Sequence, residues 1–96
     1  MPKTQIEALY SLEEYINRYS YSSSAWYVGI TSNWSNRIVN DHNVVANYTF
    51  EECYNSESAR GVESSLIEKG VDGGSGGGDN SAVYVYTYLK TAYTVE

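Results

Sequence analysis

The chain has 96 residues, with 6 Lys and Arg against 12 Asp and Glu, and a formal net charge of −6. This length allows one domain with a small core, and the charge argues against tight sequence-independent binding of nucleic acid, because cations must neutralise the phosphates. The one cysteine, Cys53, excludes an internal disulfide, and no apolar run approaches the ~20 residues of a membrane span. We therefore expect a single soluble, cytoplasmic domain over residues 1–96 that does not enter a membrane.

The first predicted element is a helix over residues 4–20. Its start, Thr4-Gln5-Ile6-Glu7, fits the capping-box pattern, in which a hydroxyl and a glutamate satisfy free backbone N–H groups. A second capping box at Ser11 leaves open whether a new helix begins there. One apolar face follows from the spacing of Ile6, Leu9, Leu12, Ile16 and Tyr19.

A strand and a short helix follow a polar connector. Residues 25–31 are aromatic and β-branched, which predicts a strand, and Gly29 within it marks a bulge or a close approach of another group. Ser32 or Asn33 can then cap a short helix that ends near Asn40.

The second half of the chain predicts two more strands and a third helix. Residues 48–54 alternate weakly, as a strand does, and a helix begins at Asn55 or Ser56 and ends at Gly70. Residues 83–89 alternate branched and aromatic side chains and predict the last strand. These elements predict an α+β fold, a small three-stranded sheet flanked by about three helices.

Residues 72–80 form a glycine-rich loop with five glycines. Its bare N–H groups could cradle a phosphate, but it lacks the lysine and Ser/Thr of the Walker pattern and precedes a strand instead of a helix. Asp72 and Asp79 flank it and would repel an anion. A flexible connector is the favoured interpretation, and a flap over a cleft is the alternative.

The helix after Asn55 carries a carboxylate within its apolar stripe. Glu63 lies one turn after Ala59 and one turn before Ile67, on the face that Val62 and Leu66 also share. A buried carboxylate requires a cation, a pocket or a proton. Glu63 therefore either bends into solvent at the edge of the stripe or points into a cleft as a ligand for a hard cation such as Mg²⁺.

Three other side chains have both a structural and a functional interpretation. Arg37 can pair with Asp41, one turn later, or its planar fork can hold a phosphate and offset charge in a transition state. His42, the only histidine, is either a satisfied structural residue or a general base. Tyr27 belongs either to the core or to a site in which it takes a proton from water.

Residues 26 to about 69 resemble the GIY-YIG nuclease superfamily. Its motifs match the triplet Tyr27-Val28-Gly29, the helix with Asn36-Arg37-Ile38, His42 after that helix, and Glu63 within the helix from Ala59 to Ile67. The resemblance implies a GIY-YIG-like fold and cleavage of phosphodiester bonds in DNA. By that resemblance Tyr27 would help to activate water, Arg37 would contact the scissile phosphate, and Glu63 would bind a single Mg²⁺ or Mn²⁺ ion.

The chain departs from the family in its first signature strand, which is missing before Tyr27, and with it goes one of two tyrosines. The family's late asparagine has no counterpart, and we do not assign its role to Asn80. We hypothesise that residues 83–89 occupy the missing strand's place and supply Tyr84, Tyr86 or Tyr88 as the substitute. A strand far from Tyr27 would exclude this.

Two functions follow from these observations. The first is a metal-dependent nuclease, or a degenerate descendant of one, that acts on DNA through a local site. The second is a non-catalytic module whose acidic, tyrosine-rich surface binds another protein. Convergence of Tyr27, Arg37 and Glu63 on one cleft would favour the first. An ion pair between Arg37 and Asp41, together with a Glu63 side chain that faces solvent, would favour the second.

Overall fold

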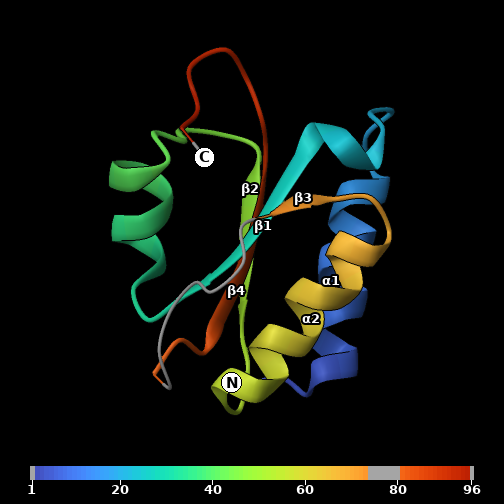
Figure 1. Ribbon diagram of the computed structural model, residues 1–96, viewed down its shortest axis with the longest axis vertical. Coiled ribbons are helices and arrows are strands. Elements are labelled where there is room, and N and C mark those ends of the chain that lie inside the picture. Colours follow the sequence, from blue (N-terminus) through green and yellow to red (C-terminus); the bar gives the residue numbers. More distant parts are fainter. Residues whose placement is uncertain (1, 74–80, 96) are drawn as a thin grey trace.

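The computed structural model describes residues 2–73 and 81–95 (Figure 1). The described helices are α1 (Gln5–Asn17), the single-turn η1 (Ser23–Ala25), the π-helix η2 (Asn36–Asp41) and α2 (Ser56–Glu68). The described strands are β1 (Trp26–Thr31), β2 (Tyr48–Glu52), β3 (Asp72–Gly73) and β4 (Tyr84–Leu89). These strands form one sheet in the order β2-β4-β1-β3, in which β4 is antiparallel to β1 and β2, and β3 is parallel to β1.

The predicted α+β class is confirmed, with four described strands instead of three. The additional strand, β3, arises where α2 ends. Gly70 adopts φ = 102°, as a C′ glycine does, and the buried Val71 then brings the chain alongside β1. Asp72 and Gly73 therefore pair with β1 instead of opening the predicted loop. The remainder of that loop, residues 74–80 with Asn80, lies outside the described residues.

Helix α1 is a single helix that begins as its sequence predicts. The Glu7 N–H donates to the Thr4 hydroxyl (3.2 Å), and the Thr4 N–H donates to the Glu7 carboxylate (3.0 Å). Ser11 does not start a second helix, since its hydroxyl donates to the Glu51 carboxylate on β2. Of the expected apolar face, Leu12 and Ile16 are buried, but Ile6 is 79% exposed.

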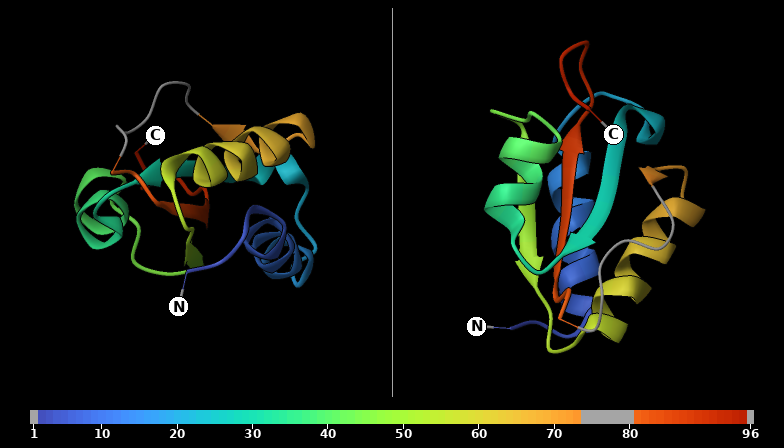
Figure 2. Two further views of the ribbon diagram at one scale, coloured as in Figure 1. Left: turned by 90° about the horizontal axis from the view of Figure 1, so that it is seen from below. Right: turned by 60° about the vertical axis from the view of Figure 1, so that its left-hand side comes forward.

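The sheet separates two clusters of buried side chains. Helices α1 and α2 cover one face and η2 lies against the other (Figures 1 and 2). On β1, Trp26, Val28 and Ile30 pack under the two long helices, whereas Tyr27 packs on the η2 side, following the two-residue alternation of a strand. The part of the chain that the structure describes contains no helix with the length and hydropathy needed to cross a bilayer.

Candidate active site

Strand β4 lies beside β1 along its whole length. Tyr88 stands opposite Tyr27 in the register, and Tyr86 stands opposite Gly29. The placement that we hypothesised for residues 83–89, next to the Tyr27 strand, is therefore confirmed. Tyr86 and Tyr88 belong to the cluster on the η2 face, and both are almost fully buried.

Gly29 allows the Tyr86 ring to lie across β1. A Cβ atom at Gly29 would stand 2.3 Å from the Tyr86 hydroxyl oxygen and 2.5 Å from its Cζ, far inside van der Waals contact. Any side chain at this position would therefore displace the tyrosine. Of the two predictions for Gly29, a close approach of another group is the correct one.

The π-helical turn brings Arg37 and His42 to the same side of η2. Asn33 caps the helical turn as predicted, with its side-chain oxygen accepting from the Asn36 N–H (3.1 Å), but hydrogen bonding then shifts to residues five apart. The His42 N–H donates to the Arg37 carbonyl (3.0 Å). In an α-helix, residues five apart point about 140° away from each other. The wider turn reduces this separation, and both side chains contact the Tyr86 hydroxyl.

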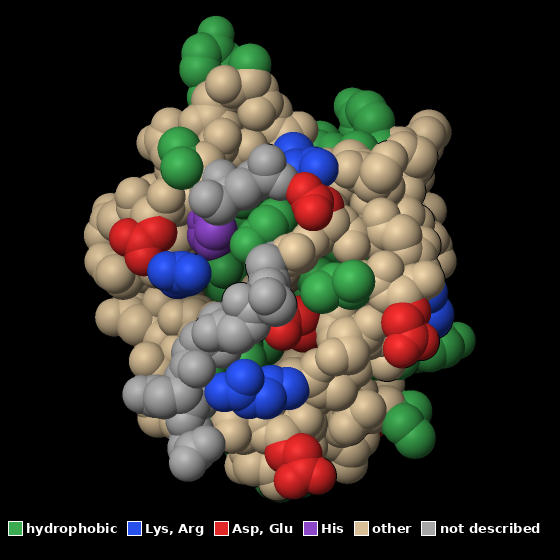
Figure 3. Space-filling view, viewed as in Figure 1, with side chains coloured by type: hydrophobic (Ala, Val, Ile, Leu, Met, Phe, Trp, Pro, Cys, Tyr) green, Lys and Arg blue, Asp and Glu red, His purple; other side chains and the backbone are tan. Residues whose placement is uncertain are grey.

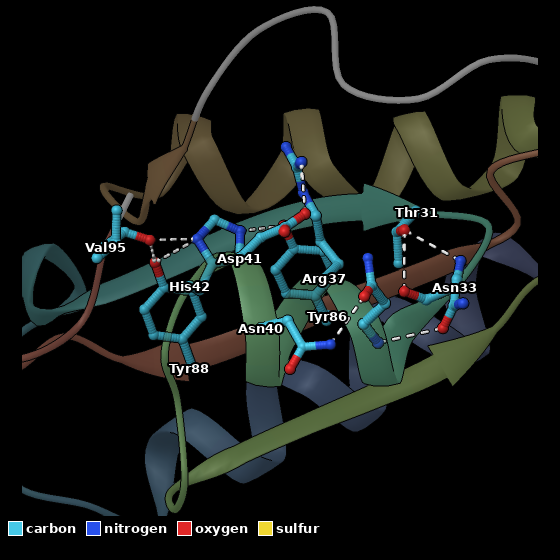
Figure 4. A network of polar contacts seen from close by, with 10 residues as sticks. Thr31, Asn33, Arg37, Asn40, Asp41, His42, Tyr86, Tyr88 and Val95 are labelled. Atoms are coloured by element: carbon cyan, nitrogen blue, oxygen red, sulfur yellow. Dashed lines mark hydrogen bonds and ion pairs between the residues drawn. The ribbon is translucent and has the colours of Figure 1, made fainter.

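His42 is buried in a ring of tyrosines, with 3% of its surface exposed (Figure 4). Its Nε2 lies 2.7 Å from the Tyr86 hydroxyl, and its Nδ1 contacts the Val95 carbonyl and, at 3.1 Å, the Tyr88 hydroxyl. The Tyr27 ring packs on the imidazole with centroids 5.2 Å apart. These contacts place a titratable ring, its hydroxyl partner and a predicted site tyrosine in one cluster.

The protonation of His42 follows from its partners. The Val95 carbonyl can only accept, so Nδ1 carries the hydrogen and Nε2 of the neutral ring accepts from the Tyr86 hydroxyl. Burial lowers the pKa of His42, an effect that the Val95 hydrogen bond opposes. The neutral ring is therefore the dominant form at pH 7.

Arg37 contacts two neighbouring side chains, those of Asp41 and Tyr86. Its guanidinium lies 3.3 Å from the Asp41 carboxylate, as the structural interpretation predicted, and both side chains are more than 40% exposed. The guanidinium also lies close enough to the Tyr86 hydroxyl that this contact is the main cause of a raised pKa for Arg37. Exposed ion pairs contribute little free energy, about 0–1 kcal/mol. An incoming anion could therefore replace Asp41.

Glu63 does not extend into solvent. Only 8% of the residue is exposed. Burial raises the pKa of Glu63, while Arg60 lowers it. The Glu63 charge in turn contributes to the raised pKa of Tyr86, as the smallest of its causes.

The Tyr86 hydroxyl contacts both His42 and Arg37, whereas Glu63 acts on it only through its charge. Burial raises the pKa of Tyr86 to about 12, with Arg37 lowering it and with Tyr27 and Glu63 raising it further. Figure 3 shows the corresponding face, with the single histidine (purple) beside acidic and basic side chains. The sequence did not single out Tyr86 from Tyr84 and Tyr88, because that choice depends on the register against Gly29.

Among the described residues, a metal ion could be held through a single carboxylate, that of Glu63. The described residues contain no group of three or more His, Cys, Asp or Glu side chains able to enclose an ion. One buried carboxylate does suit Mg²⁺, which proteins often hold through one or two carboxylates, with substrate phosphates and water as its other ligands. No protein-family model, curated protein or solved structure matches this chain.

Proposed function

We propose that the protein is a metal-dependent phosphodiester nuclease, or a degenerate descendant of one, that acts on DNA through a local site. The observation that carries this proposal is the contact of Arg37 and His42 with the Tyr86 hydroxyl, together with the burial of Glu63, whose charge also acts on that hydroxyl. The three side chains come from the π-helix η2, the residue after it, and α2. A guanidinium, a neutral imidazole and a buried carboxylate would together supply phosphate binding, proton uptake and cation binding.

Arg37 would hold the scissile phosphate. Its fork presents parallel N–H donors to two phosphate oxygens and would offset the charge that develops as the bond to phosphorus forms. Its side chain is 44% exposed, so a phosphate can reach it by displacing Asp41. Because the net charge is −6, this contact has to be local, and binding should weaken as salt rises.

The Tyr86–His42 pair would take up the proton of the attacking water. As water transfers a proton to the Tyr86 oxygen, the Tyr86 hydroxyl proton moves to Nε2 of His42, 2.7 Å away. The raised pKa of Tyr86 disfavours a free phenolate, so both transfers must occur together. The hydroxide then bonds to phosphorus, and the departing oxygen is protonated from solvent. Tyr86 is 1% exposed, so the site has to open for substrate.

Glu63 would hold the cation, Mg²⁺ or Mn²⁺. Such an ion polarises a phosphate oxygen and stabilises the departing oxygen. Tyr27, partly buried against the His42 ring, would line the water-binding side of the site.

The test is incubation with single-stranded, duplex and branched DNA in the presence of Mg²⁺ or Mn²⁺. Wild-type protein should cleave at least one of these forms. Glu63→Gln keeps the shape but loses the charge, and should cleave about 100-fold more slowly or worse. Glu68→Gln is the matched control, because Glu68 lies on the exposed face of the same helix. Equal loss in both variants, or none in Glu63→Gln, would refute the role of Glu63.

The second candidate function, a protein-interaction module, is favoured by the outer surface of α1. Ile6 and Tyr10 are 79% and 71% exposed, and they border a hollow of about 380 Å³ that Glu7 and Glu14 also line. Such a surface suits a basic, apolar segment of another protein. Folded wild-type protein that cleaves no DNA form, with no Mg²⁺-induced NMR shift at Glu63, would favour this function.

A further inference from the structure

The chain after β4 turns back toward the candidate site. The Thr91 N–H donates to the Thr94 hydroxyl (3.0 Å), the Thr94 hydroxyl donates to the Thr91 carbonyl (3.1 Å), and the Tyr93 N–H donates to the Thr91 hydroxyl (3.1 Å). The side chains of Thr91 and Thr94 thus stabilise a turn through hydrogen bonds to its backbone. We call residues 91–95 the return segment.

The return segment is anchored on His42 through its backbone. The Val95 N–H donates to the His42 carbonyl (2.8 Å), and the Val95 carbonyl accepts from Nδ1 of the His42 ring (Figure 4). The Asn43 side-chain amide donates to the Tyr93 carbonyl (3.0 Å). The Val95 side chain is 56% exposed, so hydrogen bonds, and not apolar packing, hold this segment against the ring.

Of the two groups on Nδ1, only the Val95 carbonyl determines where the hydrogen lies. The Tyr88 hydroxyl lies 3.1 Å from Nδ1 and donates to the Val95 carbonyl (3.4 Å). Without that carbonyl it could instead donate to Nδ1, so it fits both neutral tautomers. The carbonyl has no hydrogen to donate, so it requires Nδ1–H. If it were withdrawn, Tyr88 could donate to Nδ1, and Nε2–H would then point at the Tyr86 oxygen.

We propose that the return segment is a positioning element that sets the tautomer of His42, and thereby the direction in which a proton moves between Tyr86 and the ring. Its consequence for cleavage rests on the proposed function, but the tautomer itself does not. The other titratable or charged groups around the ring are Arg37, Asp41, Tyr27, Tyr86 and Tyr88. None of their contacts requires a hydrogen on Nδ1.

The tautomer is measured directly by ¹⁵N NMR of the imidazole, which is unambiguous because the chain has one histidine. Wild-type protein above the pKa of His42 should show Nδ1–H. Val95→Pro removes the N–H that anchors Val95 to the His42 carbonyl, and should move a substantial fraction of the ring to Nε2–H. Val95→Ala is the matched control, because it keeps both backbone groups and should resemble wild type.

A second variant tests the same proposal in case Val95→Pro fails to fold. Thr91→Ala/Thr94→Ala opens the turn without introducing proline and should shift the tautomer in the same direction as Val95→Pro. If DNA is cleaved, both variants should lower the rate about 10-fold or more, whereas Val95→Ala should not. Nε2–H in the wild type, or Nδ1–H retained in both variants, would overturn the proposal. The NMR result stands whether or not the protein cleaves DNA, so the two proposals fail separately.

Discussion

Replacing Gly29 with alanine tests the centre of the site. The new Cβ would stand 2.3 Å from the Tyr86 hydroxyl oxygen, so the ring must move by about 1 Å to reach ordinary contact. The ring cannot swing freely, because Tyr86 is 1% exposed and its hydroxyl lies 2.7 Å from His42. Overpacking costs about 1–3 kcal/mol and a disrupted buried hydrogen bond a similar amount. Alanine recovers up to about 1 kcal/mol through the unfolded chain.

We therefore expect Gly29→Ala to lower the free energy of unfolding by about 2–4 kcal/mol. Gly61→Ala is a demanding control, because a Cβ at Gly61 would also stand 2.3 Å from another side chain, that of Gln5. Gln5 is exposed and can rotate away, and Gly61 lies inside α2, where alanine is favoured by about 1 kcal/mol. The same nominal clash should thus leave Gly61→Ala as stable as wild type or more so.

Urea denaturation followed by circular dichroism measures both variants, and an unchanged m-value would show that the comparison concerns the same unfolding transition. ¹⁵N NMR of His42 adds a local measurement, since displacement of Tyr86 should shift the Nε2 signal in Gly29→Ala alone. A loss below about 0.5 kcal/mol in Gly29→Ala, the size of an ordinary surface substitution, would mean that Tyr86 does not lie over this glycine. The placement of the Tyr86 hydroxyl between His42 and Arg37 would then be wrong.

Four further outcomes are expected. Tyr86→Phe should destabilise the fold by about 1–3 kcal/mol, because the buried Nε2 of His42 loses its donor, and should lower any cleavage about 100-fold. Burial raises the pKa of Glu63 above 4.5, so the folded protein binds that proton more tightly. Glu63→Gln should therefore be more stable than wild type at pH 7 in urea titrations, with the difference vanishing below about pH 4. Burial lowers the pKa of His42 from 6.5, so the unfolded chain binds this proton more tightly than the folded protein does. The free energy of unfolding should therefore fall as the pH drops below 6.5. A free energy of unfolding that stays constant between pH 7 and 5 would contradict this. Arg37→Lys keeps the charge but loses the planar fork, and should slow DNA cleavage at least about 10-fold. Arg18→Lys, at the residue that follows α1, should have no effect in the same assay.

The ends of the long helices could be predicted from the sequence where hydrogen bonds between nearby residues define them. The capping box at Thr4 and the asparagine cap of α2 each involve residues three positions apart, and Gly70 ends α2 in the left-handed conformation that glycine favours. The stripe containing Glu63 was readable for the same reason, since side chains one turn apart share a face.

The π-helical turn could not be predicted from the spacing of nearby residues. The sequence predicts a short helix near Arg37, but an α-helix would separate Arg37 from His42 by about 140°. The wider turn is compatible with the tertiary packing of Ile38 and Val44 against Tyr86 and Tyr88, and Val44 donates to the Ile38 carbonyl as the chain leaves the helix. This geometry involves packing between distant residues, which local propensity does not describe.

By itself, then, the sequence indicated the two long helices and three of the four described strands, because each of these depends on neighbours a few positions away. It also supplied the four residues proposed for the site. Only the tertiary structure decided that β4 enters the sheet between β1 and β2, that Tyr86 covers Gly29, and that Val95 reaches a ring 53 positions earlier. Strand order and register arise from contacts between distant segments, and a slip of one residue would have turned Tyr86 to the opposite face.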